Sequence, residues 1–162
     1  MAMLVAALLA LAACGAQPLD GPCLASDAET TVQVPFGRLE GVSHEIEGDV
    51  EVAMFRFDRS VAGSTTIVVA PANRPYREFR FDEPVVIAGD RQLEIGLTGL
   101  IGGADADRLR SDPSDGQLIR EIVQVVAKDG AAWVLGVDGR TCVRVRTSAE
   151  AATMTLLVTT AE

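Results

Sequence analysis

Apolar and polar residues alternate along most of this chain, and this two-residue period limits the fold more than any other feature. In residues 92–98, Leu93, Ile95 and Leu97 fall on one face of an extended segment. Successive side chains of a strand point to opposite faces, so this pattern predicts a half-buried β-strand. Similar patterns, or runs rich in Val and Ile, predict further strands at residues 30–34, 50–58, 65–70, 119–128, 133–137, 141–146 and 154–158.

Two of these segments depart from simple alternation. In residues 50–58 the apolar parity switches between Met54 and Phe55, which predicts either a β-bulge or burial on both faces. Residues 122–126 carry apolar side chains on both faces, as a central strand does.

Turn residues separate the predicted strands. Asp129-Gly130 and Asp138-Gly139 are strong hairpin signals, so we expect the three late strands that they join to form an antiparallel meander. Helical periodicity is weak, and residues 148–152 suit a single turn. About nine short strands with this punctuation predict an all-β fold, an antiparallel β-sandwich.

One long interruption, residues 99–117, contains Asp105, Asp107, Asp112 and Asp115. Four carboxylates suggest calcium, but their spacing is not that of an EF-hand loop. An acidic surface loop, or a short helix flanked by coil, is the preferred interpretation.

The N-terminus has the form of a bacterial lipoprotein signal. Leu11-Ala12-Ala13-Cys14-Gly15 closes an uncharged apolar run, with small residues before the expected cut and a cysteine to carry the lipid. The alternative is an ordinary secretory signal that contains a cysteine. The run is too short to span a bilayer, which takes about 20 residues. We therefore expect a signal peptide in residues 1–13, lipidation of Cys14, a flexible tether in residues 14–27 and one domain in residues 28–162, outside the cytoplasm and anchored to the membrane.

The cysteines predict a disulfide. If Cys14 carries lipid, Cys23 and Cys142 remain, and in an oxidising compartment we expect them to pair. Two separate buried thiols are the alternative. The chain has one histidine and no Cys/His spacing typical of zinc, so no metal or other cofactor is expected.

The net charge is −9, from 14 Lys and Arg against 23 Asp and Glu. Such a chain repels phosphate backbones and shows no basic stripe with interleaved aromatics, so we expect no nucleic-acid partner. The expected membrane contact is the lipid anchor.

Residues 73–80 group three arginines and the single tyrosine on this acidic chain. Arginine forks suit carboxylates, such as those of wall polymers, and a tyrosine can pack on a sugar. The candidate binding residues are Arg74, Tyr76, Arg77 and Arg80. The alternative is an edge strand whose arginines prevent association between sheets.

Two other residues suggest chemistry but have plainer interpretations. Trp133 could stack on a sugar, but Leu135 and Val137 share its strand face, which favours the core. His44 could serve a small hydrolase, but no GxSxG elbow supplies a nucleophile, so a structural role is preferred. No catalytic residue is assigned.

The chain resembles the AMIN-like domains of actinobacterial lipoproteins, because several short pieces of sequence occur in the same order in both. These pieces are Phe55-Arg56-Phe57-Asp58, Asp82-Glu83-Pro84-Val85, the run from Trp133 to Arg140, and Val143-Arg144-Val145. The resemblance covers about residues 47–159. AMIN domains are β-sandwiches that bring wall amidases and secretion components to peptidoglycan. The resemblance implies a non-enzymatic, lipid-anchored envelope module that contacts peptidoglycan or another envelope protein. A small secreted hydrolase, using surface carboxylates or His44, and an assembly lipoprotein with a membrane-protein partner are the alternatives.

Overall fold

The structure is a computed structural model, and it describes residues 21–24, 27–72, 74–79, 81–99, 109–110, 118–127 and 130–161. At 109–110 and 130–131 it describes the backbone alone. The predicted signal peptide with Cys14, the four aspartates of the acidic loop, and Arg80 lie outside these residues.

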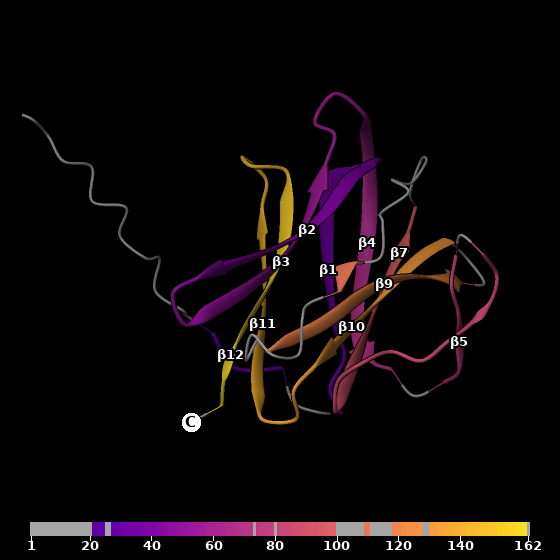
Figure 1. Cartoon of the computed structure of the whole chain (residues 1–162). Helices are drawn as coiled ribbons and strands as arrows, with labels where there is room; N and C mark the ends of the chain where they lie inside the picture. Colours follow the sequence, from indigo (N-terminus) through magenta and orange to yellow (C-terminus); the bar gives the residue numbers. More distant parts are fainter. Residues whose placement is uncertain are drawn as a thin grey trace, which may run out of the picture.

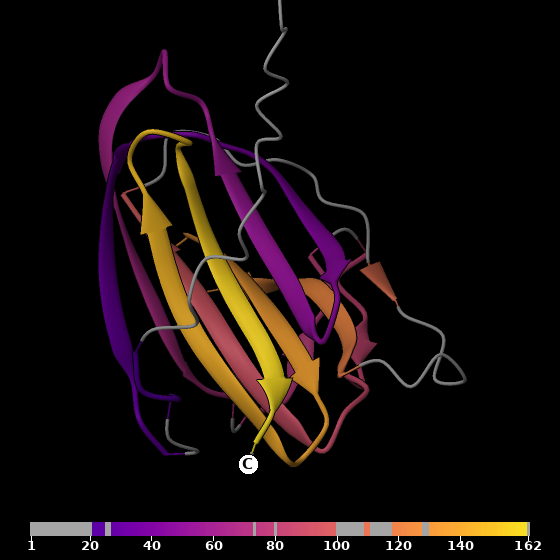
Figure 2. The same cartoon turned by 90° about the vertical axis from the view of Figure 1, so that its left-hand side faces the viewer.

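Two antiparallel sheets pack face to face, which confirms the all-β sandwich (Figures 1 and 2). The six-stranded sheet has the order β1 (Thr30–Phe36), β4 (Ala62–Pro71), β7 (Arg91–Thr98), β10 (Gly130–Val137), β9 (Ile119–Ala127) and β8 (Leu109–Arg110). The four-stranded sheet has the order β11 (Thr141–Ser148), β12 (Thr153–Thr160), β3 (Val50–Phe57) and β2 (Leu39–Glu47). None of the described residues belongs to a helix long and apolar enough to cross a membrane.

The core lies between the two sheets and is filled by the residues that the alternation selects. Leu93, Ile95 and Leu97 of β7 are all 1% exposed or less. Phe55 of β3 meets Trp133 of β10 edge to face, with ring centroids 5.8 Å apart. Trp133 is therefore a core residue, as its strand pattern predicts, and its 1% exposure leaves no ring surface for a sugar.

The first half of β3 is buried on both faces, which agrees with the second of the two interpretations of its parity switch. Phe55 and Phe57 point into the core, while Val52, on the outer face, is only 4% exposed. The pairing of β3 with β12 runs without a register shift. The bulge lies instead on the neighbouring strand β2, between Leu39 and Gly41.

The expected three-stranded meander is wrong at its second turn. β9 and β10 pair as a hairpin, but β11 belongs to the other sheet and pairs with β12. Asp138 forms the corner, because its carboxylate accepts two 2.7 Å hydrogen bonds from the Arg120 guanidinium. Its amide also donates to the Leu118 carbonyl. These long-range contacts direct the chain across the sandwich although Asp-Gly locally favours a hairpin.

A two-stranded ribbon, β5 (Tyr76–Arg77) with β6 (Pro84–Val85), covers the outer face of β9 and β10. It encloses a second, smaller core made of Tyr76, Ile87, Val123, Val125, Ala132 and Val134. This cover explains why β9 is apolar on both faces, although Val126 at its end is 43% exposed.

The chain returns from the ribbon to β7 by passing very close to β10. A Cβ atom at Gly136 would lie 1.7 Å from the Ala88 carbonyl oxygen, so only glycine fits there. The amide of Ala88 donates to the carboxylate of Glu121, which is fully buried. The ribbon is therefore fixed to the sheet at its C-terminal end.

Candidate functional site

The three described candidate binding residues, Arg74, Tyr76 and Arg77, lie in β5 or just before it, and two of them share one acidic partner. The Arg74 guanidinium binds both carboxylate oxygens of Glu94 on β7, at 3.1 and 2.7 Å. The Tyr76 hydroxyl donates to the same carboxylate. The Arg74 guanidinium also lies over the Tyr76 ring, 5.2 Å from its centroid. Burial, followed by the Glu94 hydrogen bond, raises the pKa of Tyr76 to about 12.

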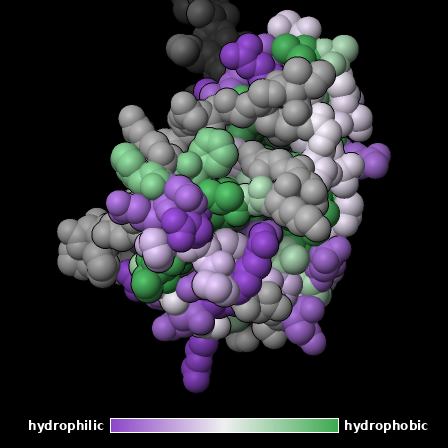
Figure 3. Space-filling view, turned by 90° about the vertical axis from the view of Figure 1, so that its right-hand side faces the viewer, coloured by the Kyte–Doolittle hydropathy of each residue, from purple (hydrophilic) through white to green (hydrophobic). Residues whose placement is uncertain are grey.

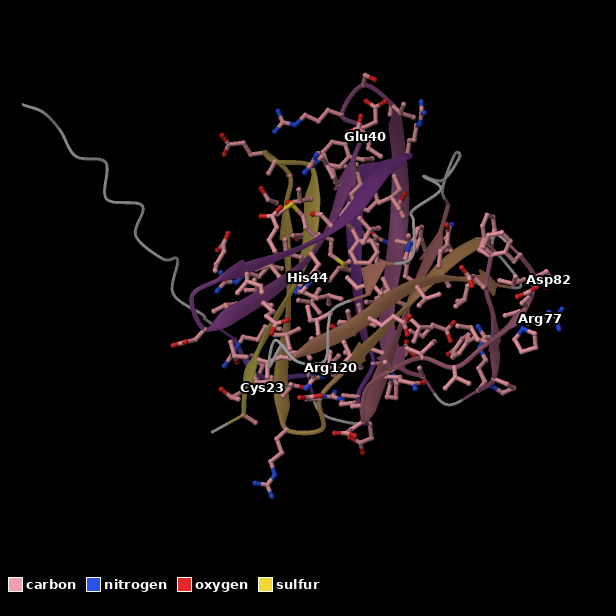
Figure 4. All side chains as sticks on the ribbon, in the orientation of Figure 1. Cys23, Glu40, His44, Arg77, Asp82 and Arg120 are labelled. Atoms are coloured by element: carbon pink, nitrogen blue, oxygen red, sulfur yellow. A yellow bond between two sulfur atoms is a disulfide. The ribbon has the colours of Figure 1, made fainter. Side chains whose placement is uncertain are left out.

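The third candidate, Arg77, is paired within the ribbon. Its Nε donates to Asp82 Oδ1 at 2.7 Å and its Nη2 donates to the Asp82 carbonyl, and the two residues point toward each other in Figure 4. The Arg77 hydrogen bond lowers the pKa of the Asp82 carboxyl. Arg74 and Arg77 are thus already neutralised by acids of this chain, so an added carboxylate would compete with existing ion pairs.

The ribbon also exposes apolar side chains that the sequence did not single out. Phe79 is 46% and Phe81 62% exposed, and both belong to the turn that joins β5 to β6. The amide of Phe79 donates to the Gln124 carbonyl, and Glu78 bridges Val125, so the ribbon turn is held against β9. We name the ribbon tip as Arg77, Phe79, Phe81 and Asp82. Figure 3 faces this side, where hydrophobic and hydrophilic surface lie next to each other.

His44 lies on β2 and has a structural partner. Its Nε2 is 3.0 Å from Oε2 of Glu51, a carboxylate whose residue is 5% exposed. The same carboxylate accepts the backbone amides of Leu118 and Ile119 at the start of β9. Glu51 therefore ties β2 and β9 to β3. Ser43 precedes His44 on the strand, so it points to the opposite face and does not form a nucleophile–base pair with it.

The opposite side of the molecule holds the N-terminal segment Gly21–Leu24. Cys23 and Cys142 of β11 form a disulfide, with their Cα atoms 5.1 Å apart. The Leu24 amide donates to the Val143 carbonyl at 2.7 Å, and Arg144 Nε donates to the Gly21 carbonyl at 2.9 Å. We name Gly21–Leu24 with Cys142, Val143 and Arg144 the stapled flank. The described end of the expected tether is thus held against the domain.

The stapled flank and the ribbon tip lie on opposite sides of the sandwich, as the labels of Cys23 and Asp82 show in Figure 4. Within the part of the chain that the structure describes, no group of three or more His, Cys, Asp or Glu residues could hold a metal ion. Comparisons with known proteins found no matching family model, curated protein or solved structure.

Sequence reasoning selected the ribbon but not the chemistry of its surface. Its arginines are the polar signal, and the two that the structure describes, Arg74 and Arg77, bind acids of the same chain. The exposed large apolar side chains here are Phe79, Phe81 and Val86. For the two phenylalanines, their positions between charged residues in residues 77–82 were the available signal.

Proposed function

We propose that this chain is a lipid-anchored, non-enzymatic binding module of the bacterial cell envelope. The disulfide between Cys23 and Cys142 carries the proposal. Such bonds persist in oxidising compartments outside the cytoplasm, which agrees with an exported chain. The cysteine pairing and the lipoprotein-like segment around Cys14 are independent features that support the same location.

The stapled flank supports a short connection to the membrane. The candidate lipidated Cys14 precedes the held Gly21 by seven residues (21 − 14), which reach at most about 25 Å when fully extended. The domain would then stay near the bilayer with its stapled flank closest to the anchor. A lipoprotein cysteine carries at least two acyl chains, and two membrane signals suffice for stable anchoring.

The environment of His44 supports a non-enzymatic role. Its partner Glu51 is occupied by two backbone amides, so the pair braces three strands. A hydrolase would need a nucleophile or a water within reach of a base. The hydrolase alternative gains no specific support from this arrangement.

The class of partner follows from the AMIN-like resemblance and from the ribbon. The resemblance favours peptidoglycan or another envelope protein. The internal pairing of Arg74 and Arg77 favours a partner that binds through uncharged groups, because a carboxylate ligand would have to displace Glu94 or Asp82.

Fractionation of cells that express Cys14→Ser tests the anchor. We expect the variant to leave the membrane fraction or to remain unprocessed, while the double variant Cys23→Ser/Cys142→Ser stays with the membrane as a matched control. A Cys14→Ser chain that is processed normally and still sediments with membranes would overturn the anchor.

Sedimentation with purified peptidoglycan at low salt tests the wall partner. We expect wild type to be retained and a Phe79→Ser/Phe81→Ser variant to be released. If wild type is not retained, peptidoglycan is not the partner. The remaining alternative is an assembly lipoprotein, whose membrane-protein partner should co-purify from detergent extracts.

A further inference from the structure

We propose that the outward face of β11 lies against the anionic headgroups of the membrane. The outward positions of this strand, with the residue just before it, are Arg140, Cys142, Arg144 and Arg146. Alternate residues of a strand share a face, and the valines between these residues point into the core. The ladder with β12 extends to Arg140, whose carbonyl accepts the Ala161 amide at 3.1 Å. We name Arg140, Arg144 and Arg146 the arginine face; Figure 2 looks onto the sheet that carries it.

The arginine face is positive on an acidic chain. Residues 139–161 hold its three arginines and one acid, Glu150, so their formal charge is +2, and the remainder of the chain carries −11 (−9 − 2). β11 and β12 contain no Asp or Glu. β2 turns Glu45 and Glu47 outward on the same sheet, but three strands away from β11. Three strand spacings are about 14 Å, beyond the screening length of about 8 Å at physiological salt.

The hydrogen bonds of Arg144 leave its charge unneutralised. Its Nε donates to the Gly21 carbonyl at 2.9 Å, and its Nη1 donates to Thr159 Oγ1 at 3.4 Å. Both acceptors are uncharged. Arg74 and Arg77 of the ribbon, in contrast, each bind a carboxylate. The positive charge of Arg144 therefore remains available to an anion such as a lipid phosphate.

The tether ends beside the arginine face, which favours the membrane as the anion. Cys142, on this face, is bonded to Cys23, and Gly21 is bound to Arg144. This step rests on the proposed lipid anchor: seven residues from Cys14 hold the arginine face within about 25 Å of the bilayer. An anionic surface repels the rest of this chain and attracts its positive part. The ribbon tip then points away from the membrane, because it lies on the opposite side of the sandwich.

Binding of the full chain to lipid vesicles tests the contact. The chain is produced without export, so that Cys14 carries no lipid, and is oxidised to form the disulfide. Binding is compared between vesicles of phosphatidylcholine alone and vesicles with equal parts of phosphatidylglycerol. Residues 1–13 contain no charged side chain, so apolar binding through them is common to both vesicle types. We expect wild type to bind the anionic vesicles at least about tenfold more tightly, whereas a net charge of −9 favours the opposite order.

Two double variants locate the preference. Arg140→Gln/Arg146→Gln leaves Arg144 on Gly21 and should lower the preference for anionic vesicles at least about tenfold, since each arginine near an anionic surface contributes about fivefold. Arg38→Gln/Arg59→Gln is the matched control, because it changes the net charge equally at exposed residues in the β1–β2 and β3–β4 turns and should keep the preference. Thermal melts verify that each variant is folded. If Arg146→Gln does not fold, Arg140→Gln alone should lower the preference about fivefold.

Three results would overturn the proposal: wild type without a preference for anionic vesicles, equal losses in the two double variants, or a preference that persists at about 1 M salt, where charges are screened beyond about 3 Å. Wild type that ignores vesicle charge but binds soluble polyphosphate through Arg140 and Arg146 would assign the arginine face to an anionic polymer instead. The chain in this test carries no lipid, whereas the anchor is tested by cell fractionation, so failure of the anchor and failure of the arginine face are distinguishable.

Discussion

At the stapled flank, a disulfide and hydrogen bonds to backbone groups hold Gly21–Leu24 on β11, whereas the ribbon rests on β9 and β10 through a small side-chain core and a short backbone contact at Glu78 and Phe79. The first flank has its exposed edge covered by the chain's own N-terminal segment. The second has a small core beneath it and apolar side chains above it. The stapled flank thus restricts the chain, whereas the ribbon exposes apolar side chains to solvent.

The difference has an energetic meaning. A covalent link restricts the whole unfolded ensemble, so the stapled flank supports global stability. The ribbon, held by a small core and a few hydrogen bonds, can open without unfolding the sandwich, as regions with few contacts do. The ribbon is therefore the part of the described structure best suited to adjust to a partner.

The largest expected effect belongs to the stapled flank. Cys23→Ser/Cys142→Ser should lower the free energy of unfolding by about 3–5 kcal/mol, because the bond closes most of the domain into one loop. Urea unfolding measures the loss, and wild type under reducing conditions should match the variant. A loss below about 1 kcal/mol would mean that the hydrogen bonds of Gly21–Leu24, not the disulfide, secure this flank.

The second effect is expected at the ribbon. Tyr76→Ala should cost about 3 kcal/mol, since it empties the small core and removes a donor to Glu94. Tyr76→Phe keeps the ring and should cost about 1 kcal/mol. Hydrogen exchange should show faster exchange in the alanine variant at Phe79 and along β9 than in β3 or β12. Uniform loss of protection would contradict local opening.

The effect of Tyr76 ionisation on stability gives a further test of the contrast between the ribbon and the stapled flank. The pKa of Tyr76 in the folded protein is raised from 10.0 to about 12. The stability that the protonated hydroxyl contributes is therefore complete below pH 10 and is lost as pH rises toward 12. We expect a fall of about 1–2 kcal/mol in the unfolding free energy, absent in Tyr76→Phe. Tyr76 is the single tyrosine, so tyrosinate absorbance reports it alone. A midpoint near 10 would contradict its burial.

The smallest effect is expected from Arg144→Ala. This change removes the hydrogen bond to the Gly21 carbonyl and should cost about 0.5–1 kcal/mol while the disulfide remains. The matched control is Arg140→Ala in the exposed β10–β11 turn, which should change the unfolding free energy less. A loss of unfolding free energy as large as that of the Cys23→Ser/Cys142→Ser variant would mean that Arg144 stabilises the stapled flank as much as the disulfide does.

The alternation of apolar and polar residues predicted most strands, because a strand with one buried face carries an apolar residue at every second position. β7 and β12 were readable in this way, and one of the two interpretations of the parity switch in β3, burial on both faces, holds for the first half of that strand. β2 was not predicted, because Glu40, Glu45 and Glu47 on this edge strand interrupt any apolar period. The corner at Asp138 was misread since local turn chemistry does not reveal Arg120, 18 residues earlier.

The candidate site shows the same limit. Arg77 pairs with Asp82 five residues away inside one turn, a contact that a local pattern can suggest. Arg74 pairs with Glu94, twenty residues away, which requires the pairing of β4 with β7 that sets Ala70 opposite Glu94. The arginine group therefore marked the correct segment, but ion pairs that depend on tertiary structure determine which of its side chains remain available.

The position of the disulfide has a consequence for the order of events during biogenesis. Cys23 and Cys142 are 119 residues apart, so the first cysteine is synthesised long before its partner. In an exported chain, Cys23 would wait as a free thiol until nearly the whole domain has emerged, and the bond would form only after β11 is in place. Non-local strand pairs such as β1 with β4 and β3 with β12 form slowly for the same reason of chain separation. Formation of the Cys23–Cys142 disulfide would then follow the folding of the domain and would not direct it.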